Sequence, residues 1–243
     1  MRVLLLVLTL SSFLCAEVLK ISFSRSSEEP YVFIEKRKLR GGVLKELMDA
    51  ISKQSGIKMK YVLVSKRNQE KEIDSGVIDG ACLINPEEFS NAKDYQWSNS
   101  LYKEEDVLIV RVEDEQKLQS IKSLYGHSVG TISSHSYPHL DPFFENETIK
   151  RVNNKKLSNS ITQLKFGVVD AVVDTKLAVG HCIQKKELEG KFSISNKVID
   201  TQELHCAFRK DTKISLNKIN SALATLKSKG VIDKILNKYR ASL

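Results

Sequence analysis

The chain has 243 residues and a formal net charge of +8. This length allows one large domain or two modest domains with cores of their own. The Lys residues are scattered, and no basic run alternates with aromatic residues, so the charge predicts a solvated Lys-rich surface and argues against a nucleic-acid-binding protein.

The N-terminus has the features of a secretory signal peptide. Met1-Arg2 provides a positive start, Val3 to Leu14 is an apolar stretch too short to anchor in a bilayer, and Ala16 is a small residue at its end. We predict cleavage of residues 1–16 and a periplasmic location, with the net charge falling to +7. Cys15 raises the alternative of lipid attachment, although Leu14 is not the small residue that such a site requires. No later stretch has 18 consecutive apolar residues, so we expect a soluble mature chain.

The first part of the mature chain alternates strands and helices. We predict, in order, a strand at 18–23, a helix between Gly42 and Gly56, a strand at 59–64 and a short helix at 66–75. The longer helix follows from apolar residues at i, i+3, i+4 and i+7: Leu44, Leu47, Met48 and Ile51. This order indicates an α/β unit.

The second part begins with another strong strand. The predicted elements are a strand at 107–110, a charged linker at 113–116, a strand at 128–132, a Ser-rich turn at 133–137, a helix at 177–187 and a strand at 204–208. Two amphipathic helices end the chain, the first with Leu216, Ile219, Leu223 and Leu226, and the second after Gly230.

Two segments repeat one pattern, 91 positions apart: Gly76-Val77-Ile78-Asp79 and Gly167-Val168-Val169-Asp170. In both, a polar helical stretch ends at a Gly suited to the left-handed cap, and the Asp starts an apolar run typical of a buried parallel strand. The repeat predicts two similar α/β lobes with a ligand cleft at the carboxyl ends of their strands.

Three cysteines would remain after cleavage. Cys82 lies in an apolar run and is interpreted as a small buried hydrophobic residue, whereas Cys182 and Cys206 are candidates for a disulfide within the second lobe. His181 and His205 precede these two cysteines, but their spacing matches no metal-ligand pattern. We expect neither a metal nor a cofactor.

Several segments in this order resemble one protein family. They are Pro30-Tyr31 before Gly41-Gly42, the two repeats, Trp97-Ser98 before Tyr102, Gly126 to Thr131, and Gly230-Val231-Ile232-Asp233 near the end. Together they resemble the polar-amino-acid branch of the bacterial extracellular solute-binding proteins, the periplasmic receptors of ABC importers. The resemblance runs over essentially the whole mature sequence.

The resemblance implies a two-lobed periplasmic-binding-protein-like fold (type II), each lobe a mixed sheet flanked by helices. Residues 17–116 would form the first segment of lobe one, 117–200 lobe two, and 201–243 the return strand and helices that complete lobe one. In this family the turn after the Gly-Thr strand, here His135-Ser136-Tyr137, binds a ligand carboxylate through backbone N–H groups. Asp174 would receive the ligand's ammonium group.

One departure from the family concerns the α-carboxylate. The family's Thr-x-x-Arg pattern is replaced by a segment that starts at Asn85, has no Arg and carries two Glu residues, so an ordinary α-amino acid held in the usual way is doubtful. Arg67 or Arg25 would be a replacement cation. Tyr31 and Asn85 complete the candidate binding residues.

Each candidate also has a structural explanation. Asp174 would then terminate a strand, His135 would be a solvated turn residue, Arg67 and Arg25 would be surface residues, and Tyr31 would pack in the core or at the cleft mouth.

Three hypotheses for the function follow. The first is a monomeric periplasmic receptor that closes on a small polar solute, an amino acid or a related compound, and serves an inner-membrane ABC permease. The second is an orphan or sensory ligand-binding module of the same fold. The third is an enzyme similar to the cyclohexadienyl dehydratases, against which we count the lack of paired carboxylates among the candidate residues.

Overall fold

The computed structural model describes residues 18–133, 135–212 and 215–240, so the predicted signal peptide lies outside the described residues. The strands are β1 (Val18–Phe23), β2 (Phe33–Glu35), β3 (Lys38–Gly41), β4 (Lys58–Leu63), β5 (Gly80–Ile84), β6 (Tyr95–Trp97), β7 (Tyr102–Arg111), β8 (Ser128–Ile132), β9 (Lys150–Asn154), β10 (Ala171–Thr175) and β11 (Phe192–Arg209). The α-helices are α1 (Val43–Ser55), α2 (Gln69–Asp74), α3 (Asp141–Glu145), α4 (Leu157–Lys165), α5 (Lys176–Lys185), α6 (Leu216–Ser228) and α7 (Val231–Asn237). Short 3₁₀ helices are η1 (Lys66–Asn68), η2 (Pro86–Glu88), η3 (Ala92–Asp94), η4 (Val112–Asp114) and η5 (Ile121–Leu124).

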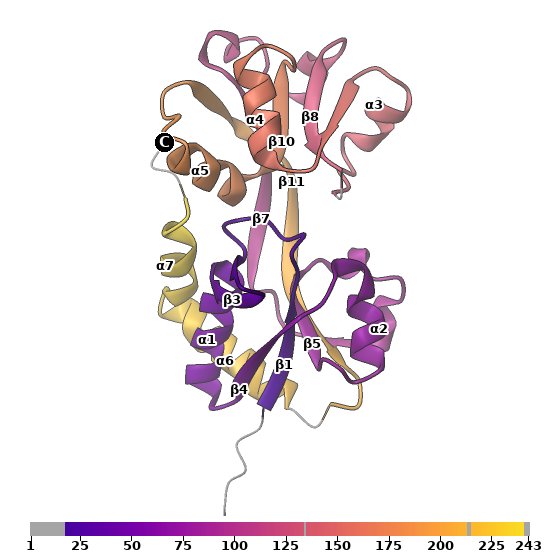
Figure 1. The fold of residues 1–243 in the computed structure, drawn as a ribbon, viewed down its shortest axis with the longest axis vertical. Helices are drawn as coiled ribbons and strands as arrows, with labels where there is room; N and C mark the ends of the chain where they lie inside the picture. The colour runs from indigo at the N-terminus through magenta and orange to yellow at the C-terminus, as the bar shows by residue number, and fades with distance from the viewer. Residues whose placement is uncertain (1–17, 134, 213–214, 241–243) are drawn as a thin grey trace, which may run out of the picture.

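The fold has two lobes, each built on a mixed sheet with helices on its faces (Figure 1). The strand order is β4-β1-β5-β11-β7-β10-β8-β9, with β6 paired to β11, and β2 and β3 form a separate hairpin. Strands β4, β1 and β5 are parallel in one lobe, and β10, β8 and β9 are parallel in the other. The two-lobed α/β fold expected from the repeat is confirmed.

Two long antiparallel strands, β7 and β11, run from one lobe into the other (Figure 1). They pair with each other in both lobes; β11 also pairs with β5 in one lobe, and β7 also pairs with β10 in the other. The sequence predicted only residues 107–110 and 204–208 as strands, because polar residues interrupt the apolar alternation outside these cores. The predicted boundary at residue 200 lies inside β11.

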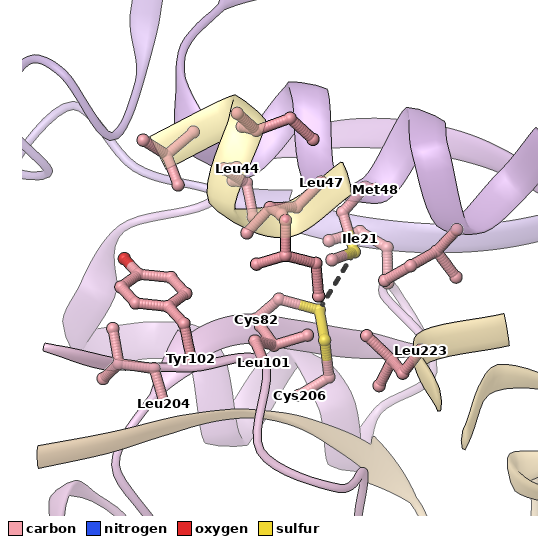
Figure 2. Close-up of a cluster of buried hydrophobic side chains, with 14 of the residues drawn as sticks. Ile21, Leu44, Leu47, Met48, Cys82, Leu101, Tyr102, Leu204, Cys206 and Leu223 are labelled. Carbon is pink, nitrogen blue, oxygen red and sulfur yellow. Dashed lines mark hydrogen bonds between the residues drawn. A yellow bond between two sulfur atoms is a disulfide. The ribbon is translucent and has the colours of Figure 1, made fainter. Parts of the chain in front are cut away.

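The C-terminal helices pack in the core of the lobe that contains β1. Helices α6 and α7 contact α1, and Leu223 and Leu236 are buried in the same cluster as Ile21 and Leu47 (Figure 2). Separate apolar clusters cover the two faces of the other lobe's sheet.

The predicted cysteine pairing is wrong. Cys82 of β5 forms a disulfide with Cys206 of β11, while Cys182 of α5 is free (Figure 2). The two bonded cysteines face each other because β5 and β11 are paired antiparallel at this register. Cys182 lies in the other lobe, so it cannot reach Cys206. Cys82 is buried as expected, but as half of a covalent link between strands.

Within the part of the chain that the structure describes, no helix has the length and apolar character needed to cross a membrane.

Candidate functional site

A cleft of about 550 Å³ lies between the lobes. It is formed at the carboxyl ends of β1, β5 and β10 and beside the connecting strands β7 and β11. Of the predicted binding residues, six line it: Tyr31, Asn85, His135, Ser136, Tyr137 and Asp174. The two predicted arginines do not line it: Arg67 in η1 and Arg25 after β1 are exposed residues outside the cleft lining.

Three buried carboxyl groups form the floor of the cleft. Glu104 and Asp106 are two residues apart on β7, so strand alternation places both on one face, and Asp174 belongs to the neighbouring strand β10. Their exposed fractions are only 6%, 6% and 2%. The Tyr31 hydroxyl donates to Glu104 Oε2 at 2.9 Å and lies 2.6 Å from Thr175 Oγ1. Tyr31 therefore connects the loop after β1 to both β7 and β10.

These carboxyl groups hold their protons more strongly than exposed ones do. Burial raises the pKa of Glu104 to about 7, although Tyr31 and Tyr102 donate to it. Burial and the nearby Asp200 raise the pKa of Asp106 to about 7. Burial, with Asp106 among the nearby carboxylates, also raises the pKa of Asp174 well above its ordinary value. Of the two Asp174 oxygens, Oδ1 accepts a hydrogen bond from the Thr175 N–H at 2.7 Å.

In the turn after β8, two of the three N–H groups that the sequence predicted for a ligand carboxylate donate to acceptors within the protein. The His135 N–H donates to the Ile132 carbonyl at 3.1 Å, and the Tyr137 N–H donates to Asp141 Oδ2 at 3.0 Å. The Ser136 hydroxyl also donates to Asp141 Oδ2. Burial and the nearby Lys66 lower the pKa of the His135 ring to about 4, so this ring is neutral at pH 7.

The first repeat reaches the cleft through Leu83 and Asn85. Leu83 has a φ of 62°, a left-handed conformation that is strained for a residue with a Cβ, and it turns the chain at the end of β5. The Asn85 side chain caps η2 by accepting from the Glu87 N–H, while its own N–H donates to Glu88 Oε1. Lys66 forms an ion pair of 2.7 Å with Glu88.

Sequence reasoning missed Glu104 and Asp106, and it wrongly found no paired carboxylates in the cleft. The signal was present: the two residues flank Glu105 at alternate positions, and both lie on the face that buries Leu108. The predicted strand began at residue 107, so this alternation was not recognised. Glu28, in the loop after β1, was missed as well; its Oε2 accepts from the Leu157 N–H at the start of α4, in the other lobe.

Fold and cleft together define a two-lobed ligand-binding protein. The chain belongs to the bacterial extracellular solute-binding proteins, family 3, which it matches over residues 21–242. Among curated proteins, no sequence matches the chain.

Solved structures with the same fold are ligand-binding proteins rather than enzymes. An ancestral arginine-binding protein bound to arginine is 24% identical, with a TM-score of 0.70 over 91% of this chain and 97% of that one. Substrate-binding domain 2 of GlnP from Lactococcus lactis, in its open conformation, is 21% identical, with a TM-score of 0.72 over 93% and 96%. The GluR0 ligand-binding core from Nostoc punctiforme, in complex with L-glutamate, is 18% identical, with a TM-score of 0.68 over 91% and 98%.

Proposed function

We propose that the protein is an exported, monomeric receptor that captures a small polar solute, an amino acid or a related compound, and delivers it to an inner-membrane ABC permease. The observation that carries the proposal is the polar cleft between two lobes that are connected through β7 and β11. Two crossing strands permit a hinge motion that closes the lobes on a ligand. Residues 117–200 would move as lobe two against the rest of the mature chain.

The binding residues in this proposal are Tyr31, Asn85, His135, Ser136, Tyr137 and Asp174. The buried carboxyl groups of Glu104 and Asp106 join them, since they line the same cleft. The proposal drops Arg67, because its exposed side chain does not face the cleft.

Export to the periplasm is supported by three features. The Cys82–Cys206 disulfide suits an oxidising compartment. The family is extracellular, and the first sixteen residues have the composition of a signal peptide. Intact-mass analysis of the exported protein should give a chain that begins at Glu17, and a mass that still includes Met1 would contradict cleavage.

A thermal-shift screen of amino acids, organic acids and polyamines tests the binding function. A solute at 100 times its Kd should stabilise the folded protein by about 2.7 kcal/mol, and a compound without affinity should leave the unfolding temperature unchanged. Small-angle scattering with the hit should show a smaller radius of gyration as the lobes close. A folded protein that no compound stabilises would contradict the proposed function.

The enzyme hypothesis gains one observation, the Glu104 pKa of about 7, which suits a general acid. The charge of the cleft opposes it, because a dehydratase of this kind acts on an organic acid, and the acidic cleft repels such a substrate. Incubation of cyclohexadienyl acids with the protein, followed by mass spectrometry, should therefore show no elimination product.

A further inference from the structure

The ionisable residues that line the cleft are mostly acidic. Six residues with a carboxyl group line it, Glu28, Glu87, Glu88, Glu104, Asp106 and Asp174, against one with an ammonium group. That group, on Lys66, is already paired with Glu88. None of the arginines that the structure describes lines the cleft. The His135 ring adds no positive charge at pH 7.

Arg151 is the arginine next to this cleft, in a neighbouring hollow that also includes His135. Each nitrogen of its guanidinium group donates to an acceptor in its own lobe. It pairs with Asp141 at 3.1 Å, donates to the His135 carbonyl at 3.0 Å and donates to Asn153 Oδ1 at 2.9 Å. Arg151 is thus a support for the turn at 135–137 and does not line the cleft itself.

Three backbone N–H groups at or beside the cleft donate to carboxylates of the protein itself. Glu28 accepts a hydrogen bond from the N–H of Leu157, the first residue of α4, and Glu88 accepts one from the N–H of Asn85. Asp141 accepts a hydrogen bond from the N–H of Tyr137. At these three positions a ligand carboxylate would therefore meet carboxylates in place of free amide donors.

The acceptors, in contrast, are free. Asp106 is buried to more than nine tenths and lines the cleft, and its carboxyl group has no hydrogen bond or ion pair with any residue that the structure describes. The carboxyl group of Asp174 has no ion pair among these residues, and its one hydrogen bond comes from the N–H of the next residue in the chain. Across the described ranges, no three acidic, His or Cys side chains converge as metal ligands, which favours an extended organic cation over a metal ion.

We propose that the cleft selects small organic amines, carrying primary ammonium or guanidinium groups and no carboxylate. The inference rests on the proposed solute-binding function and names the chemical class of the solute. N–H donors on a cation satisfy buried carboxylates through charge-assisted hydrogen bonds, so the amine supplies the charge that the chain lacks. An amino acid with the same side chain would bring its carboxylate into the same acidic cleft.

Three pairs of compounds isolate the carboxylate: agmatine and arginine, putrescine and ornithine, and cadaverine and lysine. Isothermal titration calorimetry of the purified full-length mature protein should show at least one amine bound about 100-fold or more tightly than its parent amino acid. Equal affinity for both members of each bound pair would overturn the inference. So would displacement of the amine by millimolar calcium, which would assign the carboxylates to a metal ion.

Asp106→Asn tests the site itself. This variant should weaken amine binding by about 10-fold or more. It should also reduce the ratio of the affinities for agmatine and arginine, because Asp106 attracts the cationic groups of both compounds and repels the carboxylate of arginine. Glu105→Gln is the matched control: Glu105 lies between the two cleft residues on β7, is outside the cleft lining and pairs with Lys176. The control should change neither affinity. Equal losses in both variants would mean nonspecific attraction and contradict the inference.

The outcomes also separate the two proposals. Binding of glutamine or glutamate without any amine binding would overturn the inference and leave the receptor function standing. A folded protein that binds no compound of either screen would contradict both.

Discussion

The strands that follow the two Gly-Val-x-Asp repeats begin with the same contact of the Asp side chain, but they end in different side chains. Asp79 Oδ2 accepts from the Lys20 N–H, and Asp170 Oδ2 accepts from the Ser128 N–H, both at 2.8 Å. In each lobe the carboxylate thereby joins its strand to the strand beside it. The shared sequence therefore encodes the scaffold of a lobe, at the end of the sheet away from the cleft.

The carboxyl ends of the same strands carry the individual chemistry. The first strand contains Cys82, bonded to Cys206, and turns at Leu83 toward the neutral side chain of Asn85. The second strand ends in the buried carboxyl group of Asp174. The first strand is covalently fixed to the connecting strand β11, whereas the second strand ends in a carboxyl group at the cleft. This difference teaches that the repeat predicts where a ligand binds but not what binds.

Removal of the disulfide should have the largest effect on stability. The bond closes a loop with a sequence separation of 124 residues, and loops of this length are worth about 4 to 5 kcal/mol in the chain-entropy description. We expect the Cys82→Ser and Cys206→Ser double variant to lose about 2 to 5 kcal/mol of unfolding free energy in urea titrations. Cys182→Ser, the matched control in the other lobe, should change it by less than about 1 kcal/mol. Equal losses would mean that the disulfide is not the stabilising element.

Asp174→Ala should weaken ligand binding most. The loss of one charge-assisted hydrogen bond costs about 1.5 to 3 kcal/mol, or roughly 10- to 150-fold in Kd, while the fold remains intact. Asn85→Ala, at the corresponding end of the first repeat, should weaken binding by less than about 10-fold, because it removes no charge. Calorimetry with the ligand found in the screens measures both. Unchanged affinity in a folded Asp174→Ala protein would make Asp174 a structural residue.

The local elements of the fold could be predicted from the sequence because local patterns encode them. The helix of Leu44 to Ile51 and the strand at 18–23 follow from apolar periodicity, and the structure places them at Val43–Ser55 and Val18–Phe23. The Gly residues at 76 and 167 adopt the left-handed conformation with φ values of 75° and 70°. Each of these features depends on a few neighbouring residues.

The site was less predictable because it depends on contacts between distant segments. The partner of Cys206 is 124 residues away and is fixed by the register of β5 against β11, which no local pattern encodes. Asp174 was found through the repeat. Glu104 and Asp106 were missed, since a charged residue lowers the apparent strand signal where it matters most for binding.

The acidic floor of the cleft should make the ligand-free protein less stable as the pH rises. Burial and Asp200 raise the pKa of Asp106 from 3.8 to about 7, and burial raises that of Glu104 from 4.5 to about 7. Between about pH 4 and pH 7, the folded state therefore binds more protons than the unfolded state. The stability that these groups contribute is complete below about pH 4 and is lost as the pH rises through 7.

Asp106→Asn tests this pH dependence. In urea titrations without ligand, the unfolding free energy of the variant should exceed that of the parent protein by on the order of 2 kcal/mol at pH 8. At pH 4 the two values should be equal. The negative charge of Asp106 also raises the pKa of Glu104, Asp174 and Tyr137, so the substitution should lower these three pKa values as well. A difference between variant and parent that is the same at both pH values would show that Asp106 does not titrate as described.

The smallest effects are expected for the two Asp residues at which the repeated strands begin. Asp79→Ala and Asp170→Ala each leave one N–H of the neighbouring strand without its acceptor. We expect each variant to lose about 1 kcal/mol of unfolding free energy at pH 7. Asp170→Ala should lose more, because Asp170 also accepts from the Ser128 hydroxyl at 2.8 Å and lies 3.5 Å from His127.

The loss in Asp170→Ala should depend on pH. Burial opposes the ionised form of Asp170, but hydrogen bonds from Ser128 and the nearby His127 outweigh this effect and lower the pKa. Its contribution is thus present above about pH 4 and is lost as the pH falls further, so the excess loss in Asp170→Ala over Asp79→Ala should shrink at pH 3. An excess that persists at pH 3 would mean that the two starts differ in packing rather than in charge.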